Sequence, residues 1–262
     1  YNINILIIFR RKVMRKRKQK QMSESLLLGA ILATVGGFLD AHTYICRGKV
    51  FANAETGNIV LMGAKLAEGD FKDAFFYLIP ITAFACGVFC AEGIKKLFKQ
   101  NNYIHWRQIT VAAEIIALVF ISFVEPTRMH NIFTNALVAF VCSLQVQSFR
   151  QISGVPLTTT MCTGNLRSGT EHLFNAVTTK NKTVLKTAFK YYSIIFFFVL
   201  GAAIGAVLSS AIGRYSTLIA AGGLLAAFLL MFVNKEAEKR EEIFERAEEE
   251  REEAEIKAAE KL

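Results

Sequence analysis

Acidic residues are scarce over most of this chain. Of its 22 Asp and Glu residues, only ten precede residue 235, whereas soluble domains usually carry about 25% charged residues throughout. Proline is also rare, with three residues, and 53% of the residues are apolar. So few acids cannot cover the surface of a soluble domain of this size. The sequence therefore excludes a soluble globular enzyme and a disordered chain, and it predicts an all-α membrane protein that crosses the bilayer several times.

The cysteines exclude two further classes of protein. The five cysteines contain no C-x-x-C pair, and Cys86 and Cys90 lie one helical turn apart in an apolar segment. Free cysteine in such a place usually packs as a small hydrophobic residue. Neither a disulfide framework nor a zinc site is predicted. The histidines are too scattered for a metal site, and no cofactor is expected.

The charged residues form two opposed blocks at the ends of the chain. Residues 10–20 carry eight Lys or Arg and no acid, whereas residues 235–262 carry twelve acids against seven bases. A basic block before an apolar segment is typical of a cytoplasmic topology signal rather than of a nucleic-acid site. Met14 and Met22 are alternative start residues, which leaves open whether the basic arm, residues 1–21, is native. The acidic tail is predicted to form a charged cytoplasmic helix with many i, i+4 charge pairs.

Six apolar segments are long enough, or nearly so, to cross a bilayer. A helix needs about 20 apolar residues to span a hydrocarbon core of about 30 Å. Two further segments, 57–67 and 164–174, have only 11 residues each, which corresponds to about 16 Å of helix, or half a bilayer. The six long segments are residues 26–46, 74–97, 105–124, 132–149, 185–211 and 215–233.

The two short segments begin with the same tripeptide. Thr-Gly-Asn occupies residues 56–58 and 163–165, and at this offset of 107 residues Asp40 corresponds to Gln147. The order of a long segment, a loop, a short segment and two long segments also recurs. The sequence therefore predicts an internal duplication. The predicted domains are the first repeat, 22–130, and the second repeat, 131–234.

The distribution of basic residues favours one topology. If the amino terminus is inside and the short segments do not cross, the basic loops near residues 95–107 and 180–186 lie inside, as the positive-inside rule requires. Short segments that crossed would move the first of these loops outside. We therefore predict six transmembrane helices plus two re-entrant half-helices, with both termini cytoplasmic. Three crossings per repeat give a 3+3 inverted repeat, a plan that recurs in transporters with a site near mid-membrane.

A longer motif surrounds the first tripeptide. Residues 36–63 read GGFLDAHTYICRGKVFANAETGNIVLMG. This stretch, together with the second Thr-Gly-Asn, resembles the YoaK-type family of bacterial inner-membrane proteins, which is classed as a domain of unknown function. The resemblance covers roughly residues 24–233 and implies a multi-pass protein of the bacterial plasma membrane. It implies no reaction, substrate or site, because the family is described by its sequence. The basic arm and the acidic tail depart from the family pattern.

Asp40 is one candidate functional residue. It lies within the first apolar segment, where a carboxylate is costly unless it faces a cavity or a partner. Two interpretations stay open: a proton- or cation-coupled carboxylate, and a structural group that caps or forms a buried ion pair with Arg47. The corresponding Gln147 is polar but does not ionise, so the two repeats would differ chemically.

The two Thr-Gly-Asn starts are the sharper candidates. A helix that begins at mid-membrane points its free N–H groups and its positive end there. Thr suits the N-cap, Gly allows close backbone approach, and the Asn amide can donate or accept. Two such ends suit an anion or a small dipolar solute, and Glu55 would cap the first end, carry a proton or exclude anions. The alternative is that the tripeptide is simply a good helix start used twice. The candidate substrate-binding residues are Asp40, Asn53, Glu55, Thr56, Gly57, Asn58, Gln147, Thr163, Gly164 and Asn165.

Together these patterns favour a transporter or channel for a small polar or anionic solute. The alternative is a non-transporting membrane sensor or assembly protein that acts through its tail. An enzyme is not expected, because no nucleophile–base pair or metal cluster is recognisable. The expected partners are the lipid bilayer and the solute, without nucleic acid. Small residues at i, i+4 spacing in three segments favour close packing of helices within the chain, with a homo-oligomer as the alternative.

Overall fold

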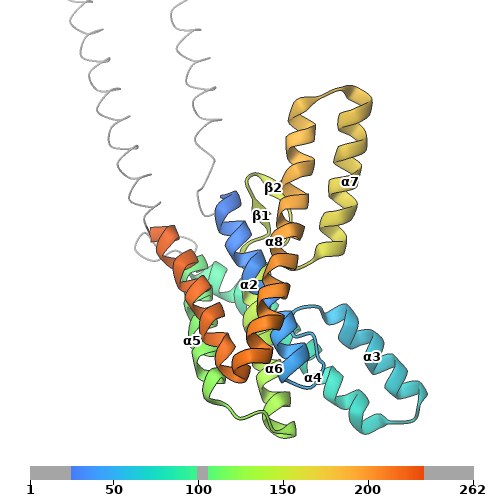
Figure 1. Cartoon of the computed structure of the whole chain (residues 1–262), viewed down its shortest axis with the longest axis vertical. Coiled ribbons are helices and arrows are strands. Elements are labelled where there is room, and N and C mark those ends of the chain that lie inside the picture. Colours follow the sequence, from blue (N-terminus) through green and yellow to red (C-terminus); the bar gives the residue numbers. More distant parts are fainter. Residues whose placement is uncertain (1–24, 99–105, 233–262) are drawn as a thin grey trace, which may run out of the picture.

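The computed structural model describes residues 25–98 and 106–232. Over these residues the chain is helical apart from short loops and one small β-ladder (Figure 1). The basic arm and the acidic tail discussed above lie outside the described residues. The elements are α2 (Leu26–Cys46), α3 (Glu55–Ala67), α4 (Phe71–Phe98), α5 (Trp106–Phe123), α6 (Arg128–Ser148), α7 (Cys162–Thr179), α8 (Lys182–Ile212), the 3-10 helix η2 (Gly213–Ser216) and a final helix, 217–232.

Five described segments are long and apolar enough to cross a membrane. Four of them are α2, α4, α5 and α6, and the fifth is the 51-residue segment Lys182–Phe232. A straight helix of that length would extend about 75 Å, more than twice the thickness of a bilayer core. Instead η2 interrupts it, Gly213 adopts a φ of +58°, and Figure 1 shows the chain turning back there. This predominantly helical fold with apolar crossings indicates a membrane protein, as the composition predicts.

Large apolar side chains face outward along the long helices. Phe89 of α4 is 82% exposed, and Phe196 and Val207 of α8 are more than half exposed. Apolar exposure on this scale would promote aggregation of a protein in water. On helices long enough to span a bilayer it instead provides the surface that contacts lipid.

Two long-range helix pairs build the interior. α2 packs along α8, and α6 packs along α4. Glycine brings the backbones together in both pairs: a Cβ on Gly201 of α8 would overlap the carbonyl oxygen of Thr34 in α2, and a Cβ on Gly87 of α4 would overlap that of Phe140 in α6. Glycines of the predicted small-residue ladders therefore serve close helix packing within the chain.

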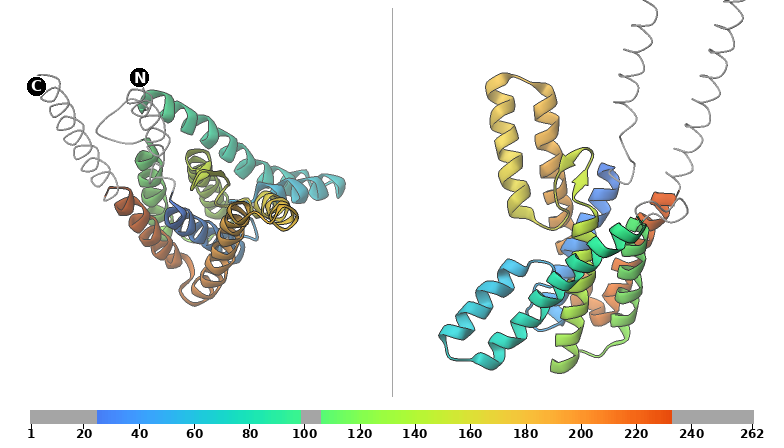
Figure 2. Two further views of the ribbon diagram at one scale, coloured as in Figure 1. Left: turned by 90° about the horizontal axis from the view of Figure 1, so that it is seen from above. Right: turned by 180° about the vertical axis from the view of Figure 1, so that it is seen from behind.

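The short helices α3 and α7 point toward opposite ends of the molecule. Each begins near the middle and forms a hairpin with the long helix that follows it, α4 or α8, and these hairpins project toward different ends in the front and rear views (Figures 1 and 2). α3 has 13 residues, close to the 11 expected. α7 has 18 residues, so it is longer than predicted, but it is too polar to be among the five candidate crossings.

A small β-hairpin that the sequence analysis did not predict follows α6. Its strands, β1 (Gln151–Ile152) and β2 (Val155–Pro156), pair antiparallel. The two turn residues, Ser153 and Gly154, both have positive φ, as a two-residue type I′ turn requires. Ile152 and Val155 are buried in a small apolar cluster with Ile194 of α8. The hairpin therefore fixes the start of the loop that leads to α7.

Candidate functional site

The loops that precede α3 and α7 meet at the middle of α2. The meeting point is Gly36, the eleventh of the 21 residues of this helix. A Cβ at Gly36 would lie 2.7 Å from Thr160 Cγ2 and 3.2 Å from Asn53 Nδ2. Asn53 and Thr160 are separated by 107 residues, the offset between the two tripeptides. Two corresponding loop residues thus converge on a position halfway along a membrane-crossing helix.

The asparagines of the two tripeptides make the same hydrogen bond. Asn58 Nδ2 donates to the carbonyl oxygen of Phe51 at 2.9 Å, and Asn165 Nδ2 donates to that of Thr158 at 2.6 Å. In each case the acceptor lies seven residues earlier in the preceding loop. Both asparagines are buried. Each side chain therefore ties the first turn of a short helix to its own loop, which is a structural role.

Polar side chains of α2 and α6 also form hydrogen bonds with these two loops. Asp40 Oδ1 accepts a 2.9 Å hydrogen bond from the backbone N–H of Asn53. In α6, Gln145 Nε2 donates to Thr159 Oγ1 at 3.1 Å. Both Asp40 and Gln145 are buried. Each loop is thus fixed by a polar side chain from the long helix that precedes it.

Glu55, the first residue of α3, is the ionisable group at the first loop. Its Oε2 accepts a 2.9 Å hydrogen bond from Asn58 Nδ2. When it is ionised, its negative charge repels the carboxylate of Asp40. Burial raises the pKa of the Glu55 carboxyl to about 7, and the hydrogen bond from Asn58 opposes this rise. A carboxyl group of this kind exchanges its proton near neutral pH.

Several buried polar atoms of the two loops, of Glu55 and of Gln145 lack a hydrogen-bond partner among the described residues. They are Nδ2 and Oδ1 of Asn53, Oγ1 of Thr160, Oε1 of Glu55 and Oε1 of Gln145. An unsatisfied buried polar group costs about 1–3 kcal/mol, and native proteins satisfy nearly all of them with protein, water or ligand. We call Asp40, Asn53, Glu55, Gln145 and Thr160 the central polar cluster. Its free donors and acceptors are suited to contact a small polar molecule.

The remaining residues of the two tripeptides face outward. Thr56, Thr163 and Gly164 are exposed, and Gly57 is partly exposed. The prediction that Thr forms the N-cap is wrong, because the caps are Ala54 and Met161 and neither makes a side-chain capping bond. The helices begin two residues earlier than expected, at Glu55 and Cys162, so Thr occupies the second helical position. The threonine side chains therefore neither cap the helices nor face the cluster.

The ion pair considered for Asp40 is not seen, and the candidate residue Gln147 contacts another helix. The buried ion pair of Asp40 with Arg47 is absent among the described residues, since Arg47 Nη2 donates instead to the carbonyl oxygen of Ile121 at 2.9 Å. Gln147 donates to Glu92 on α4, away from the second loop. Gln145, two residues earlier, is the α6 side chain that holds this loop.

Sequence reasoning missed three polar residues in this region. Thr160 could have been found from the sequence, because it lies 107 residues after Asn53, which is the offset between the two repeats. Gln145 could not have been found in this way, since the same offset relates Asp40 to Gln147. Glu114 of α5 was considered only as a packed or paired group; its side chain is buried, with Oε1 4.0 Å from Cys142 Sγ and Oε2 unpaired among the described residues. No group of three or more His, Cys, Asp or Glu in the described part of the chain is arranged to hold a metal ion.

The comparisons with known proteins identify a family. A family model described as "Protein of unknown function (DUF1275)" matches residues 28–231, which confirms the resemblance inferred from the motif around the first tripeptide. The chain belongs to this family. Neither the curated proteins nor the solved structures gave a match. The family description names no activity, so function has to be argued from the site.

Proposed function

We propose that this member of the DUF1275 family is a membrane transporter or channel for a small polar solute, which passes the central polar cluster. The observation that carries the proposal is the meeting of Asn53 and Thr160 at Gly36, with unpaired polar atoms on both. Irregular backbone is tolerated at membrane depth only where protein buries it or where it lines a polar cavity. Two such loops with free polar atoms halfway along α2 are therefore best explained by a solute path.

The architecture we propose is a 3+3 inverted repeat. In this plan α2 corresponds to α6, and α4 corresponds to α8. The observed α2–α8 and α6–α4 pairs are then equivalent contacts between the two repeats. The plan is also supported by Gly87 and Gly201, which make equivalent close contacts in the two pairs. The opposite directions of α3 and α7 fit the same plan. In this arrangement the site lies at the interface between the repeats.

We further propose that α3 and α7 are re-entrant half-helices. α3 has 13 residues, which corresponds to about 20 Å of helix and is too short to cross a core of about 30 Å. α7 is longer but polar, which suits a helix that lines an aqueous space rather than one that contacts lipid. By the positive-inside rule, both termini are then cytoplasmic in a bacterial inner membrane.

The charges of the cluster narrow the class of solute. Its two ionisable residues, Asp40 and Glu55, are both acids. Two carboxyl groups beside the path disfavour an anion when they are ionised. The proposal is therefore a neutral polar, zwitterionic or cationic solute rather than the anion that the helix ends alone suggested. Proton exchange by Glu55 would link passage to pH.

The test is an osmotic swelling assay on the full chain in liposomes. Light scattering follows swelling after transfer to isosmotic urea, glycerol, glycine, alanine or lactate. We expect at least one solute to swell protein-containing vesicles faster than protein-free ones. Thr160→Val, which replaces the free hydroxyl by a methyl group, should slow that solute, whereas the matched control Thr163→Val at an exposed position should not.

Two outcomes would contradict the proposal. One is a panel in which no solute enters faster than in protein-free vesicles. The other is equal permeability of Thr160→Val and Thr163→Val. A chain truncated after residue 234 should retain the permeability of the full chain. If it lost that permeability while still folded, the alternative of an assembly protein that acts through its tail would gain support.

A further inference from the structure

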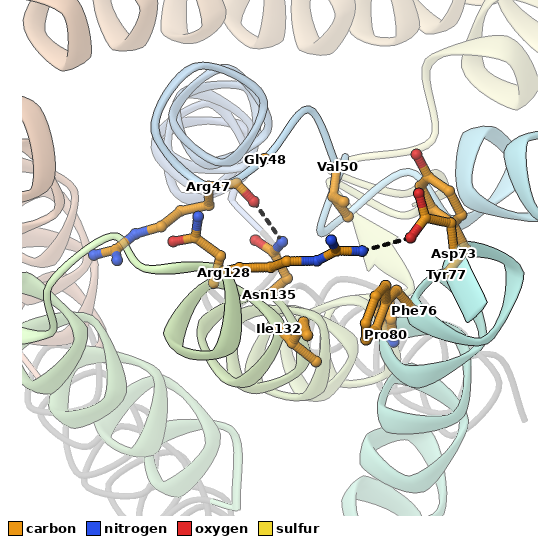
Figure 3. A pocket seen from close by; sticks show the side chains of 11 residues that line it. Arg47, Gly48, Val50, Asp73, Phe76, Tyr77, Pro80, Arg128, Ile132 and Asn135 are labelled. Carbon is orange, nitrogen blue, oxygen red and sulfur yellow. Dashed lines mark hydrogen bonds and ion pairs between the residues drawn. The ribbon is translucent and has the colours of Figure 1, made fainter.

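A second polar site lies at the end of the bundle where α2 ends and α4 and α6 begin. It is a cavity of about 310 Å³ between these three elements (Figure 3). Cavities of this size accept small organic molecules. The loop after α2 contributes Gly48 and Val50 to the cavity wall, and the same loop continues to Asn53. The cavity is therefore distinct from the central polar cluster but connected to it through one loop.

An exposed ion pair crosses this cavity. Arg128 Nη2 contacts Asp73 Oδ1 at 2.5 Å, and Figure 3 shows the arginine side chain reaching across the space to the carboxylate. The guanidinium also lies over the ring of Phe76, 4.8 Å from its centroid. Exposed ion pairs contribute little free energy, so a ligand with both charges can replace this pair by two pairs of its own. The site thus offers one fixed positive and one fixed negative group.

Two amide oxygens in the same wall lack donors among the described residues. Oδ1 of Asn131 and Oδ1 of Asn135 are buried and unpaired. Asn135 cannot rotate freely, because its Nδ2 donates to the carbonyl oxygen of Arg47 at 2.8 Å. The two asparagines lie one turn apart on α6, and both line the cavity. Their unpaired oxygens require N–H donors, which an ammonium group supplies.

Much of the remaining cavity wall is apolar, although Arg47 and Tyr77 also line it. Val50, Phe76, Pro80 and Ile132 line it from three different segments. An apolar wall beside a few fixed polar groups is typical of small-molecule sites, in which the polar groups orient the ligand and the wall takes up its carbon skeleton. A purely inorganic ion would leave this wall without a contact.

We propose that this cavity binds a small zwitterion with an apolar side chain, of the α-amino acid class. Its carboxylate pairs with Arg128, its ammonium group pairs with Asp73 and the amide oxygens of Asn131 and Asn135, and its side chain contacts the apolar wall. Binding here needs no transport, but the use of the bound molecule as a substrate rests on the proposed function. A binding measurement therefore separates failure of this site from failure of the transport proposal.

The test compares three related molecules by isothermal titration calorimetry on the full chain in detergent. The probes are leucine, 3-methylbutylamine, which lacks its carboxylate, and 4-methylpentanoate, which lacks its ammonium group. We expect leucine to bind and each partial analogue to bind at least about tenfold more weakly. Equal affinity of the amine and leucine would reassign the cavity to cations. No heat from leucine or phenylalanine up to about 10 mM, ten times a weak Kd of about 1 mM, would overturn the proposal.

Two variants identify the groups that recognise the zwitterion. Arg128→Met should weaken leucine at least about tenfold while leaving the amine unchanged, and Asp73→Asn should weaken both. The control is Arg214→Met, which removes a partly exposed arginine outside the cavity whose partner is Glu125 at 3.5 Å. It should leave leucine binding unchanged. If Arg128→Met bound leucine as the unaltered chain does, the carboxylate would not be held by this residue and the proposal would fail.

Discussion

The loops that precede α3 and α7 share a hydrogen bond but differ in charge. In both, an asparagine of the short helix donates to a loop carbonyl seven residues earlier. Only the first loop combines this bond with carboxyl groups, those of Asp40 and Glu55; the second has Gln145 and Cys162 in the nearby positions. The shared bond maintains the fold in both halves, whereas the carboxyl groups give one half a chemistry that the other lacks.

The largest expected effect tests whether the two halves pack alike. Gly201→Ala and Gly87→Ala each place a methyl group against the carbonyl oxygen of a facing helix. Because backbone cannot move aside as a side chain can, we expect each change to lower the free energy of unfolding by about 1–3 kcal/mol or more. Thermal unfolding in detergent measures the loss for each half.

Gly93→Ala is the matched control for these changes, since Gly93 lies on the same helix as Gly87 with open space around it. Alanine is a better helix former than glycine by about 1 kcal/mol, so this change should stabilise the protein. A similar loss for Gly93→Ala and Gly87→Ala would contradict the assignment of close contacts.

The next effect tests the shared hydrogen bond. Asn58→Ala and Asn165→Ala each leave a buried loop carbonyl without its donor, and we expect each to cost about 1–3 kcal/mol of unfolding free energy. The controls Thr56→Ala and Thr163→Ala change exposed side chains that make no cap, so they should stay within about 0.5 kcal/mol. A cost of about 1 kcal/mol for the threonine changes would instead support an N-cap role.

The smallest expected effect comes from Glu55, an ionisable group at the first loop. Because burial raises the pKa of Glu55 to about 7, the folded chain holds this proton at pH values where the unfolded chain, with a pKa near 4.5, has lost it. Stability from this group is therefore complete below pH 4.5, falls as the pH rises toward 7, and levels off above. The loss should be about 1–2 kcal/mol, after allowance for the partial exposure of Glu55.

Thermal unfolding across this pH range provides the measurement. Glu55→Gln should reduce the pH dependence, because the amide does not titrate, whereas the neighbouring carboxyl group of Asp40 is retained. Cys162→Ser changes the corresponding residue of the second half. Burial raises the pKa of this thiol above its ordinary value of 9.0, so the thiol does not titrate in this pH range. This variant should therefore keep the pH dependence of the unaltered chain. An unchanged slope in Glu55→Gln would show that another group carries the pH dependence.

Sequence alone predicted the helical elements well because lipid imposes a simple rule. Apolar length sets a crossing, and the first predicted segment, 26–46, coincides with α2. The repeated Thr-Gly-Asn located the starts of both short helices to within two residues. The family resemblance likewise depended on residues close together in the sequence, and the family model confirmed it.

The three-dimensional structure decided which polar residues meet and what each contacts. Thr56 and Thr163 lie on the outward faces of their helices, which the tripeptide could not reveal because a single turn has no fixed orientation before the chain packs. A fixed offset paired Asp40 with Gln147, but the second half has a β-hairpin between its long helix and its loop, and there Gln145 holds the loop instead. The cavity crossed by Arg128 and Asp73 joins residues 55 positions apart. Local pattern thus determined the elements, whereas packing across the chain determined the sites.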